Sequence, residues 1–502
     1  MRRLVKALAG ALGVGLLMGA AGPGGAAAGS GPPGGGPAVR SVLDWRPCPR
    51  DPAAECGSLR LPVDWARPSG AGFDLAVARR KAADPARRIG VLLVNPGGPG
   101  DSGVDFAVRR APSYFSPDIL ARFDIVGFDP RGIGDSAPIR CSQGLLDRRP
   151  PAYPRDQAEF ERLVAFNRAL RKDCRRHSGP VFDHADTLSV VQDMDALRQA
   201  LGERTITYFG HSYGTLIGQQ YAERYGERLR AMTLTANVDH SLGAREFMVS
   251  SAAGAEDSFH QFVRWCARTD SCALHGRDVT AVWDRLLKRA DRGEVSDPRS
   301  PDHALTATMI TAKAFRAFYG PDRAGLATEL ARLDAQPPPP GPLEPPRPSP
   351  PPDPAFHAVF CQDWRIRAED HREYARLTAA EVRAAPHMRG APRVHEAASG
   401  CMGWPEEVNN PQRPLRITKA PRILMLHSRH DPAAHYTVAA HVHRQTRGTT
   451  VLLPYEGAGH SVYGRSDCTR GAVDDYLTDL RLPSIGSCAA VTPSARGISR
   501  TE

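Results

Sequence analysis

Residues 210–214 read Gly-His-Ser-Tyr-Gly, which fits the pattern G-x-S-x-G. A short apolar run, 205–209, ends directly before the motif, and a helical pattern, 216–225, follows it. In that context the motif favours a serine on a tight turn between a strand and a helix, because its two glycines let both elements pass closely. Ser212 is therefore the predicted nucleophile. The alternative is an ordinary serine turn.

An isolated serine hydroxyl is a poor nucleophile near neutral pH, so a base must accompany it. Asp431 follows the apolar run 423–426 by a short loop, and His460 lies in a glycine-containing loop after the run 450–453. The order serine, aspartate, histidine is that of hydrolases whose nucleophile stands on such a turn. Both loops follow strand-like runs, at the ends where sites of open α/β sheets assemble. We expect His460 to move the proton and Asp431 to orient its ring, the alternative for His460 being a surface histidine.

An attacking serine also needs two backbone N–H donors for the oxyanion that develops on the substrate carbonyl. One is expected at Tyr213, directly after the nucleophile. The other is expected from the glycine-rich loop 95–100, which ends the apolar run 89–94. Gly98 is the preferred donor in that loop and Gly97 the second choice, the alternative being a turn without a catalytic part. No Lys-Ser/Thr pair follows the glycines, so phosphate binding is disfavoured.

A second group of potential ligands surrounds the predicted acid. It consists of His427, His430, Asp431, His435, His441 and His443. The group contains neither H-E-x-x-H nor a closed set of tetrahedral spacings, so we expect no metal there. The serine chemistry itself requires no cofactor.

The pattern of strands and helices indicates how these residues are positioned. From 41 to 240, continuous apolar runs such as 89–94 and 123–128 alternate with helical stretches, which favours a doubly wound, mostly parallel sheet of the α/β class. Helical patterns dominate from 241 to 415, with a proline-rich loop at 336–354. Strand-like runs return in 416–490, and 491–502 forms a tail. The chain is thus expected to hold one sheet with an inserted helical lid.

Composition narrows the partners. Of 502 residues, 41% are hydrophobic and the net charge is +10. The arginines are scattered and form no basic helix, so the charge is expected to be solvated surface and not a nucleic-acid site.

The N-terminus predicts export. Arg2, Arg3 and Lys6 precede an apolar stretch, 7–21, and Ala26-Ala27-Ala28 offers a cleavage site, so 1–28 is interpreted as a signal peptide and 29–40 as a flexible linker. The stretch is too short and glycine-rich for a stable membrane anchor. Mature protein is expected outside the cell, and twin-arginine export stays open.

An even number of cysteines agrees with export, where disulfides form. Spacing alone leaves the disulfide connectivity open. Pairs of cysteines that are neighbours along the chain are plausible: Cys48 with Cys56, Cys141 with Cys174, Cys266 with Cys272, Cys361 with Cys401 and Cys468 with Cys488.

Together these motifs resemble the secreted tripeptidyl-aminopeptidase-like α/β-hydrolases of actinobacteria, relatives of proline iminopeptidases. The matching segments are 95–100, 128–132 with 134–136, 208–215, Asp431-Pro432, and Gly459-His460 followed by Cys468 and Tyr476-Leu477. The resemblance spans 41–490 and implies a helical lid and removal of short N-terminal peptides, or esterase activity. In the family that this chain resembles, Thr-Pro usually stands three and four residues after the catalytic aspartate. This chain has Ala434-His435 there, and the difference is expected to affect pocket shape and substrate choice.

Three functions follow from these features. The first is an exported serine exopeptidase acting on peptides with free N-termini through an acyl-enzyme. The second is a secreted carboxylesterase or lipase-like enzyme with the same triad, acting on small esters. The third is a non-catalytic secreted binding protein that retains the fold.

An exopeptidase also needs a carboxylate to bind the cationic α-amino group of its substrate. The inserted region offers Asp363, Glu246, Glu256 and Asp257. Asp363 ranks first because a bridge from Cys361 would hold it in place. Its alternative role is to cap a helix that begins near Trp364.

Overall fold

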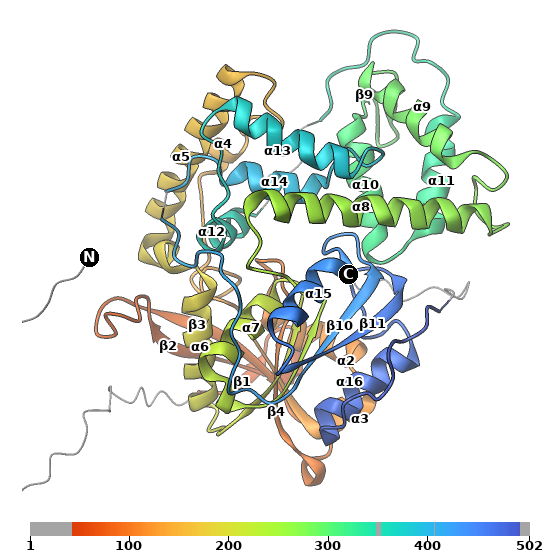
Figure 1. Cartoon of the computed structure of the whole chain (residues 1–502). Coiled ribbons are helices and arrows are strands. Elements are labelled where there is room, and N and C mark those ends of the chain that lie inside the picture. The colour runs from red at the N-terminus through yellow and green to blue at the C-terminus, as the bar shows by residue number, and fades with distance from the viewer. Residues whose placement is uncertain (1–42, 348–352, 406, 492–502) are drawn as a thin grey trace, which may run out of the picture. The chain divides into compact units, whose positions relative to one another are not determined.

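The computed structural model describes residues 43–347, 353–405 and 407–491, all in one folded unit (Figure 1). The predicted signal peptide and linker, and the tail from 492, lie outside the described residues.

A nine-stranded sheet organises the fold, in the order β1-β2-β3-β5-β4-β6-β7-β10-β11. Its strands are β1 Arg46–Cys48, β2 Asp51–Pro62, β3 Gly72–Arg80, β4 Gly90–Asn95, β5 Phe123–Phe128, β6 Ile206–His211, β7 Leu229–Thr235, β10 Ile423–His430 and β11 Thr450–Ala458. From β5 to β11 all neighbours are parallel, whereas β1, β2 and β3 are antiparallel, as is the β3–β5 pair. The mostly parallel sheet is therefore confirmed, with an antiparallel edge that the sequence patterns did not indicate.

Helices cover both faces of the sheet, which explains the continuous apolar strands. Every residue of β4 and β5 is buried. On one face, α6 (Thr187–Ala200) and α7 (Gly214–Tyr225) pack against the strands. On the other face lie α1 Gly103–Asp105, α2 Ala111–Tyr114, α3 Pro117–Arg122 and α16 Asp467–Asp479. The remaining helix of this part, α15 (Tyr436–Gln445), packs against β10 and β11.

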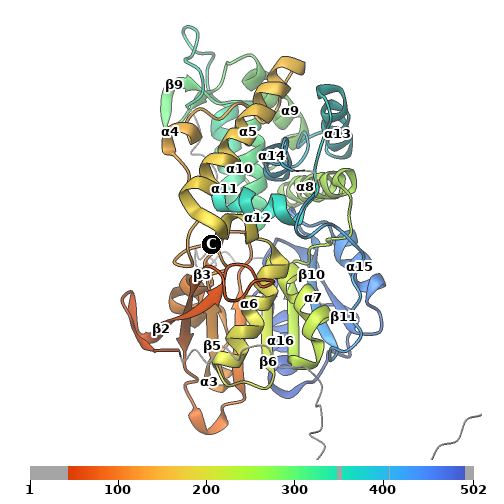
Figure 2. The ribbon, with the colours of Figure 1, turned by 90° about the vertical axis from the view of Figure 1, so that its left-hand side faces the viewer.

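The helices inserted between β7 and β10 lie together over one end of the sheet (Figures 1 and 2). They are α8 Ala244–Ala267, α9 Val279–Asp291, α10 Ala307–Tyr319, α11 Arg323–Asp334, α12 Pro354–Asp363, α13 His371–Ala384 and α14 Pro392–Gly400, with a small hairpin of β8 Ser296–Asp297 and β9 Ser300–Ala304. Helices α8 to α11 enclose a hydrophobic core of their own around Phe259, Trp283 and Phe315. We call helices α8 to α14 the lid.

One helix encoded before the insertion joins the lid. Helix α5 (Gln157–Ser178), preceded by the short α4 (Gln143–Leu146), contacts α13 and lies at the level of the lid, not on the sheet (Figure 1). Its buried Phe160 belongs to the cluster formed by α12 and α14. Asn167 reinforces the contact by donating to the carbonyls of Ser399 and Met402, at 2.9 Å each.

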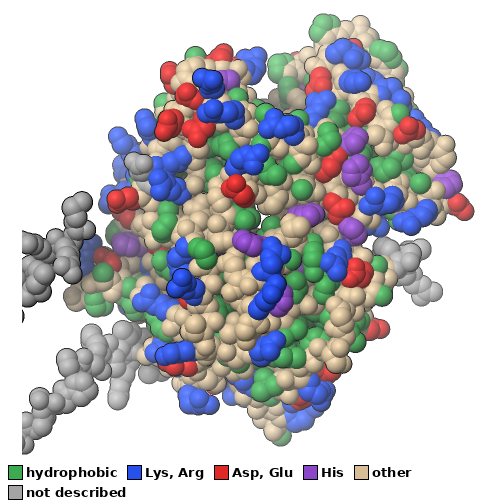
Figure 3. Space-filling model, in the orientation of Figure 1, with side chains coloured by type: hydrophobic (Ala, Val, Ile, Leu, Met, Phe, Trp, Pro, Cys, Tyr) green, Lys and Arg blue, Asp and Glu red, His purple; other side chains and the backbone are tan. Residues whose placement is uncertain are grey.

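All ten cysteines form disulfides, in the five neighbouring pairs that the spacing favoured. The bridge between Cys361 and Cys401 joins α12 to the end of α14, two helices of the lid. On the face shown in Figure 3, cationic side chains are interspersed with acidic ones, as expected for a solvated surface. None of the helices in the described ranges has the length and hydropathy needed to cross a bilayer.

Candidate active site

Ser212 occupies a strained turn between β6 and α7. Its backbone has φ = 53°, in the left-handed region that side chains rarely adopt. The flanking glycines are required by close approach, because a Cβ on Gly210 would lie 2.6 Å from the Gly214 carbonyl oxygen and one on Gly214 only 2.5 Å from that of Asn95. Backbone bonds fix the turn, since the Ser212 amide donates to Thr235 in β7 at 2.9 Å. The motif therefore forms the strand-to-helix turn that its spacing predicts.

Asp431 and His460 meet beyond the ends of β10 and β11. The Nδ1 atom of His460 lies 2.9 Å from both carboxylate oxygens of Asp431, which is fully buried. Burial favours the neutral acid, but the charge and hydrogen bond of His460 outweigh it and hold the pKa of Asp431 below its ordinary value. Because Nδ1 is occupied by the acid, Nε2 is the ring nitrogen left for proton transfer.

A cavity of about 590 Å³ brings the predicted residues together. Ser212, Tyr213, Gly98 and His460 all line it, between the sheet and the lid. Within the described chain no hydrogen bond joins Ser212 Oγ to His460, a contact that is often long before substrate binds. The cavity volume is in the range of about 300–1,000 Å³ typical of small-molecule sites.

The two glycines considered for the oxyanion hole differ in their hydrogen bonds. The Gly97 amide donates to Asn95 Oδ1 at 3.0 Å, so it is already occupied. Gly97 also approaches the turn closely, because a Cβ there would lie 2.9 Å from the Tyr213 nitrogen. Gly98 lines the cavity and Gly97 does not, so Gly98 remains the preferred candidate for the second donor.

The histidines around the acid are separated by their own partners. His427 is fully buried, accepts the Asn237 amide at 3.0 Å and lies 2.7 Å from the Ala434 carbonyl oxygen. It thereby braces the loop that carries Asp431, a supporting role that its place in an apolar strand could have signalled. The other histidines contact separate groups: His430 binds Asp257, His435 binds Thr437, His441 binds Asp239 and His443 binds Thr450.

His211, directly before the nucleophile, is another residue that sequence reasoning did not single out. It lines the cavity, and its ring lies 4.9 Å from that of His460. Burial, with the neighbouring His460, lowers the pKa of His211 to about 3. It therefore stays neutral beside the histidine that must accept a proton.

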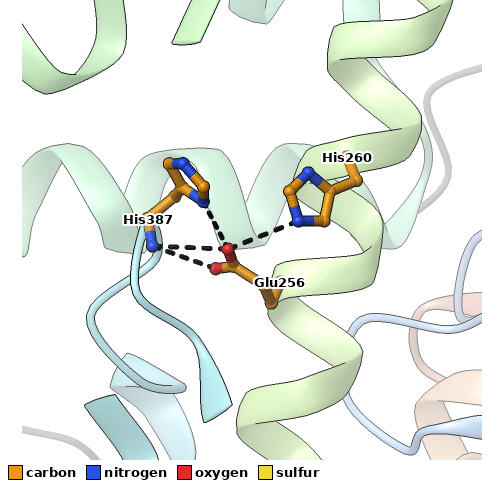
Figure 4. A group of neighbouring side chains, drawn as sticks. All are labelled: Glu256, His260 and His387. Carbon is orange, nitrogen blue, oxygen red and sulfur yellow. Dashed lines mark hydrogen bonds and ion pairs between the residues drawn. The ribbon is translucent and has the colours of Figure 1, made fainter. Parts of the chain in front are cut away.

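The four carboxylates proposed to bind the substrate amine do not line the cavity. Glu246 is exposed on the first turn of α8. Asp257 contacts His430 at 2.7 Å. Glu256 accepts the amides of His387 and Met388 and contacts the His387 ring at 2.5 Å, with His260 3.5 Å away (Figure 4).

Glu256, His260 and His387 could together hold a metal ion. Within the described ranges they are the one group of three or more His, Cys, Asp or Glu side chains whose ligand atoms all lie within 4.8 Å of one another. Figure 4 shows both histidines pointing at the same carboxylate. That carboxylate also accepts two backbone amides of the segment after α13, so the cluster forms a contact within the lid.

Asp363 is wholly buried and does not line the cavity, so its amine-binding role stays a prediction that the geometry does not favour. It is the last residue of α12, and it caps no helix beginning at Trp364. Burial raises the pKa of Asp363 to about 7, and nearby Asp186 adds to the shift. The hydrogen-bond partners of Asp363 come from segments far away in the sequence, so its neighbours along the chain did not indicate them.

The cavity wall has an aromatic part and a charged part. The aromatic residues from the lid are Phe247, Phe356, Phe360 and Trp364. The charged residues are Asp101, Arg110, Asp353, Arg393 and Glu396. Ala433 and Ala434 also line it, so the unusual acid loop borders the space where a substrate would bind.

Asp101 and Asp353 are carboxylates that sequence reasoning missed. Neither forms an ion pair within the described ranges, whereas Glu396 is paired with Arg149 at 2.7 Å. Burial raises the pKa of Asp101, and the nearby Arg110 and Arg393 oppose that shift. Its position in the sequence could have indicated Asp101, because this residue directly follows the glycine-rich loop 95–100.

Comparison with known proteins agrees with this geometry. Residues 90–338 match the model of the alpha/beta hydrolase fold, and 386–488 match the model of TAP-like proteins. Carboxylesterase B of Mycobacterium tuberculosis H37Rv is 33% identical, covering 89% of this chain and 90% of the relative. Serine protease Hip1 of the same strain is 30% identical, covering 88% and 89%. Tripeptidyl aminopeptidase of Streptomyces coelicolor is 27% identical, covering 88% and 86%.

Proposed function

Because the chain belongs to the α/β-hydrolase family, in the group that includes tripeptidyl aminopeptidases, we propose that it is an exported serine exopeptidase that removes short peptides from free N-termini. In this proposal Ser212 Oγ attacks the scissile carbonyl carbon while His460 Nε2 takes its proton. The amides of Gly98 and Tyr213 hold the oxyanion. His460 then protonates the leaving amine, and water releases the acyl group by the same steps in reverse.

The observation that carries the exopeptidase proposal is the pair of carboxylates, Asp101 and Asp353, in the same cavity as Ser212. A peptide's α-amino group is cationic near neutral pH and needs a carboxylate partner when it leaves water. Neither aspartate forms an ion pair within the described ranges. Asp353 Oδ1 accepts the Ala355 amide as the N-cap of α12, which leaves Asp101 as the candidate partner. Asp101 is the preferred amine partner because it follows the loop that contains Gly98.

Export is supported by the five disulfides, which form and persist in oxidising compartments. The leader that would direct export belongs to the part of the chain that is not described.

A secreted carboxylesterase is the second candidate. The aromatic wall of the cavity favours it, because apolar acyl or alcohol groups would pack there. The 33% identical relative is named Carboxylesterase B, which supports the same alternative. Both candidates use the triad, so they differ only in the bond cleaved and in the group bound by the charged wall.

Kinetics on matched substrates test the proposal. The wild type should hydrolyse free-amine peptidyl arylamides far faster than their N-acetylated forms. Asp101→Asn should raise KM for the free-amine substrates more than about tenfold, because the charge is lost with little change of shape. Asp118→Asn, an exposed carboxylate on α3, is the control and should leave both substrates unaffected.

Two outcomes would contradict this. If the wild type prefers N-blocked substrates or simple esters, the esterase alternative holds. If Asp101→Asn changes KM equally for both substrate types, Asp101 shapes the cavity and does not bind the amine.

A further inference from the structure

We propose that Asp363 is a positioning residue of the oxyanion hole, which acts by holding the Tyr213 side chain so that the Tyr213 amide points into the site. The inference rests on the proposed function, since it concerns the amide that would bind the oxyanion after attack by Ser212. The last residue of a lid helix would then position a group of the active site.

Tyr213 links the site to the lid. Its backbone nitrogen follows the nucleophile, and its buried side chain runs toward α12. The phenol O–H donates to Asp363 Oδ2 at 2.6 Å. A hydrogen bond of this kind, from a neutral donor to a buried carboxylate, is among the stronger ones in proteins. The Tyr213 side chain is therefore held at its far end.

The carboxylate of Asp363 is itself held by several donors. Thr187 donates twice, from its amide to Oδ1 at 2.9 Å and from its hydroxyl to Oδ2 at 2.6 Å. Asn410 Nδ2 donates to Oδ1 at 2.8 Å. Thr187 is the first residue of α6, so its amide belongs to a helix N-terminus that favours negative charge. No cation pairs with Asp363 in the described ranges, so these dipoles alone fix its orientation.

The same network returns to the helix that carries the nucleophile. Asn410 and Gln220 exchange two hydrogen bonds, at 3.0 and 3.2 Å, and Gln220 belongs to α7. Helix α7 begins one residue after Tyr213. The turn is thus fixed by Asp363 at Tyr213 and by Asn410 at Gln220, about two turns further along α7.

This arrangement matters because an oxyanion donor must be aimed before the charge appears. A loss of alignment of about 0.5 Å is enough to weaken such a site. The left-handed Ser212 makes the following peptide a strained one, which relaxes unless its surroundings hold it. Thr215 holds the carbonyl side of this peptide, donating to the Ser212 carbonyl oxygen from its amide at 2.9 Å and from its hydroxyl at 2.7 Å. The bond from Tyr213 to Asp363 holds the residue on the amide side.

The competing explanation is that the network only stabilises the junction between lid and core. Tyr213→Phe separates the two, because it deletes one hydroxyl and leaves Asp363 three donors. The matched control is Tyr221→Phe. Tyr221 is also buried, lies in α7 and donates to a carboxylate of α6, Asp195, at 3.2 Å.

Three measurements on the full-length chain test the proposal. They are the rate of labelling by a fluorophosphonate, kcat and KM for a p-nitrophenyl ester, and the Kd of an aryl boronic acid, which forms a tetrahedral anion on the serine. Tyr213→Phe should lower the labelling rate and kcat about tenfold or more and weaken the boronic acid equally. KM for the ester should change less than about threefold. Tyr221→Phe should alter only thermal stability.

Asp363→Asn should reproduce these losses, and the double variant should lose little more than either single one. The inference is overturned if the wild type is labelled at Ser212 while Tyr213→Phe keeps its labelling rate and kcat, or if both variants lose only stability. A wild type that the fluorophosphonate does not label would overturn the proposed function and this inference with it. The two failures are therefore distinguishable.

Discussion

The proposed chemistry depends on one atom, the hydroxyl oxygen Oγ of Ser212. It lies in a cavity with the Nε2 side of His460, whose other nitrogen is bound by Asp431. No second nucleophile with this support lines the cavity, as far as the described ranges extend. The role of Ser212 can therefore be tested by removing its hydroxyl oxygen.

Replacing Ser212 with alanine should lower turnover by about 10³-fold or more, because the covalent step is lost while the cavity is kept. Folding should be unaffected, as judged by the melting temperature and circular dichroism. Ser113→Ala, an exposed hydroxyl at the rim of the same cavity, is the matched control. A Ser212 variant that retained more than about a tenth of the wild-type rate would assign the nucleophile elsewhere.

The three proposed catalytic residues could be singled out from the sequence because each lies in a local pattern. Ser212 is flanked by glycines that the turn requires, and Asp431 and His460 each follow an apolar strand. Asp363 had no comparable signal. Its role depends on Thr187, Tyr213 and Asn410, which are distant in sequence, so only the folded chain shows that its carboxylate faces inward.

Two lid helices end at the site, and their last residues contact its parts. Tyr319, the last residue of α10, accepts the His460 amide at 2.9 Å and packs its ring 4.7 Å from the imidazole. Asp363, the last residue of α12, binds Tyr213. The lid therefore positions the loop of the histidine as well as covering the cavity.

Helix packing explains why the position of a helix in the fold is harder to predict than the helix itself. Helix α5 has apolar residues at helical spacing, which says that one face is buried but not against what. Its partners, α13 and α14, are encoded more than 190 residues later. No helix was predicted at this position, and a helical pattern alone would not assign it to the lid.

The disulfide between α12 and α14 gives a prediction at this scale. Both helices line the cavity, so replacing Cys361 and Cys401 together with alanine should loosen its wall. The loss of stability should be about 2–4 kcal/mol, as for a disulfide that closes a loop of this length. KM should rise several-fold while kcat per labelled site changes little.

The matched control removes Cys48 and Cys56 instead, in the antiparallel edge of the sheet. That variant should lose stability with KM unchanged. If both double variants shift KM alike, the bridge in the lid has no special effect on the cavity.

At the scale of the whole molecule, a sheet that carries the proposed nucleophile is joined to a lid with its own core. The aromatic cluster around Phe259 and Trp283 shows that the lid is more than a loop. This division was predicted from the loss of strand patterns after residue 240. The antiparallel strands before β4 were not predicted, because β2 and β3, with 12 and 9 residues, interrupt their buried positions with exposed ones and form no continuous apolar run.

The disulfides provide the prediction that concerns the molecule as a whole. Every cysteine is paired, and the five bridges are spread over the sheet edge, α5, the lid and α16. Disulfides persist in oxidising compartments, so protein recovered from the medium should show these five linkages by non-reducing peptide mapping. Protein made in a reducing cytosol should have a lower melting temperature, because the unfolded chain regains the freedom that the bridges remove. Ten free thiols in fully active, equally stable protein would contradict both the pairing and the proposed export.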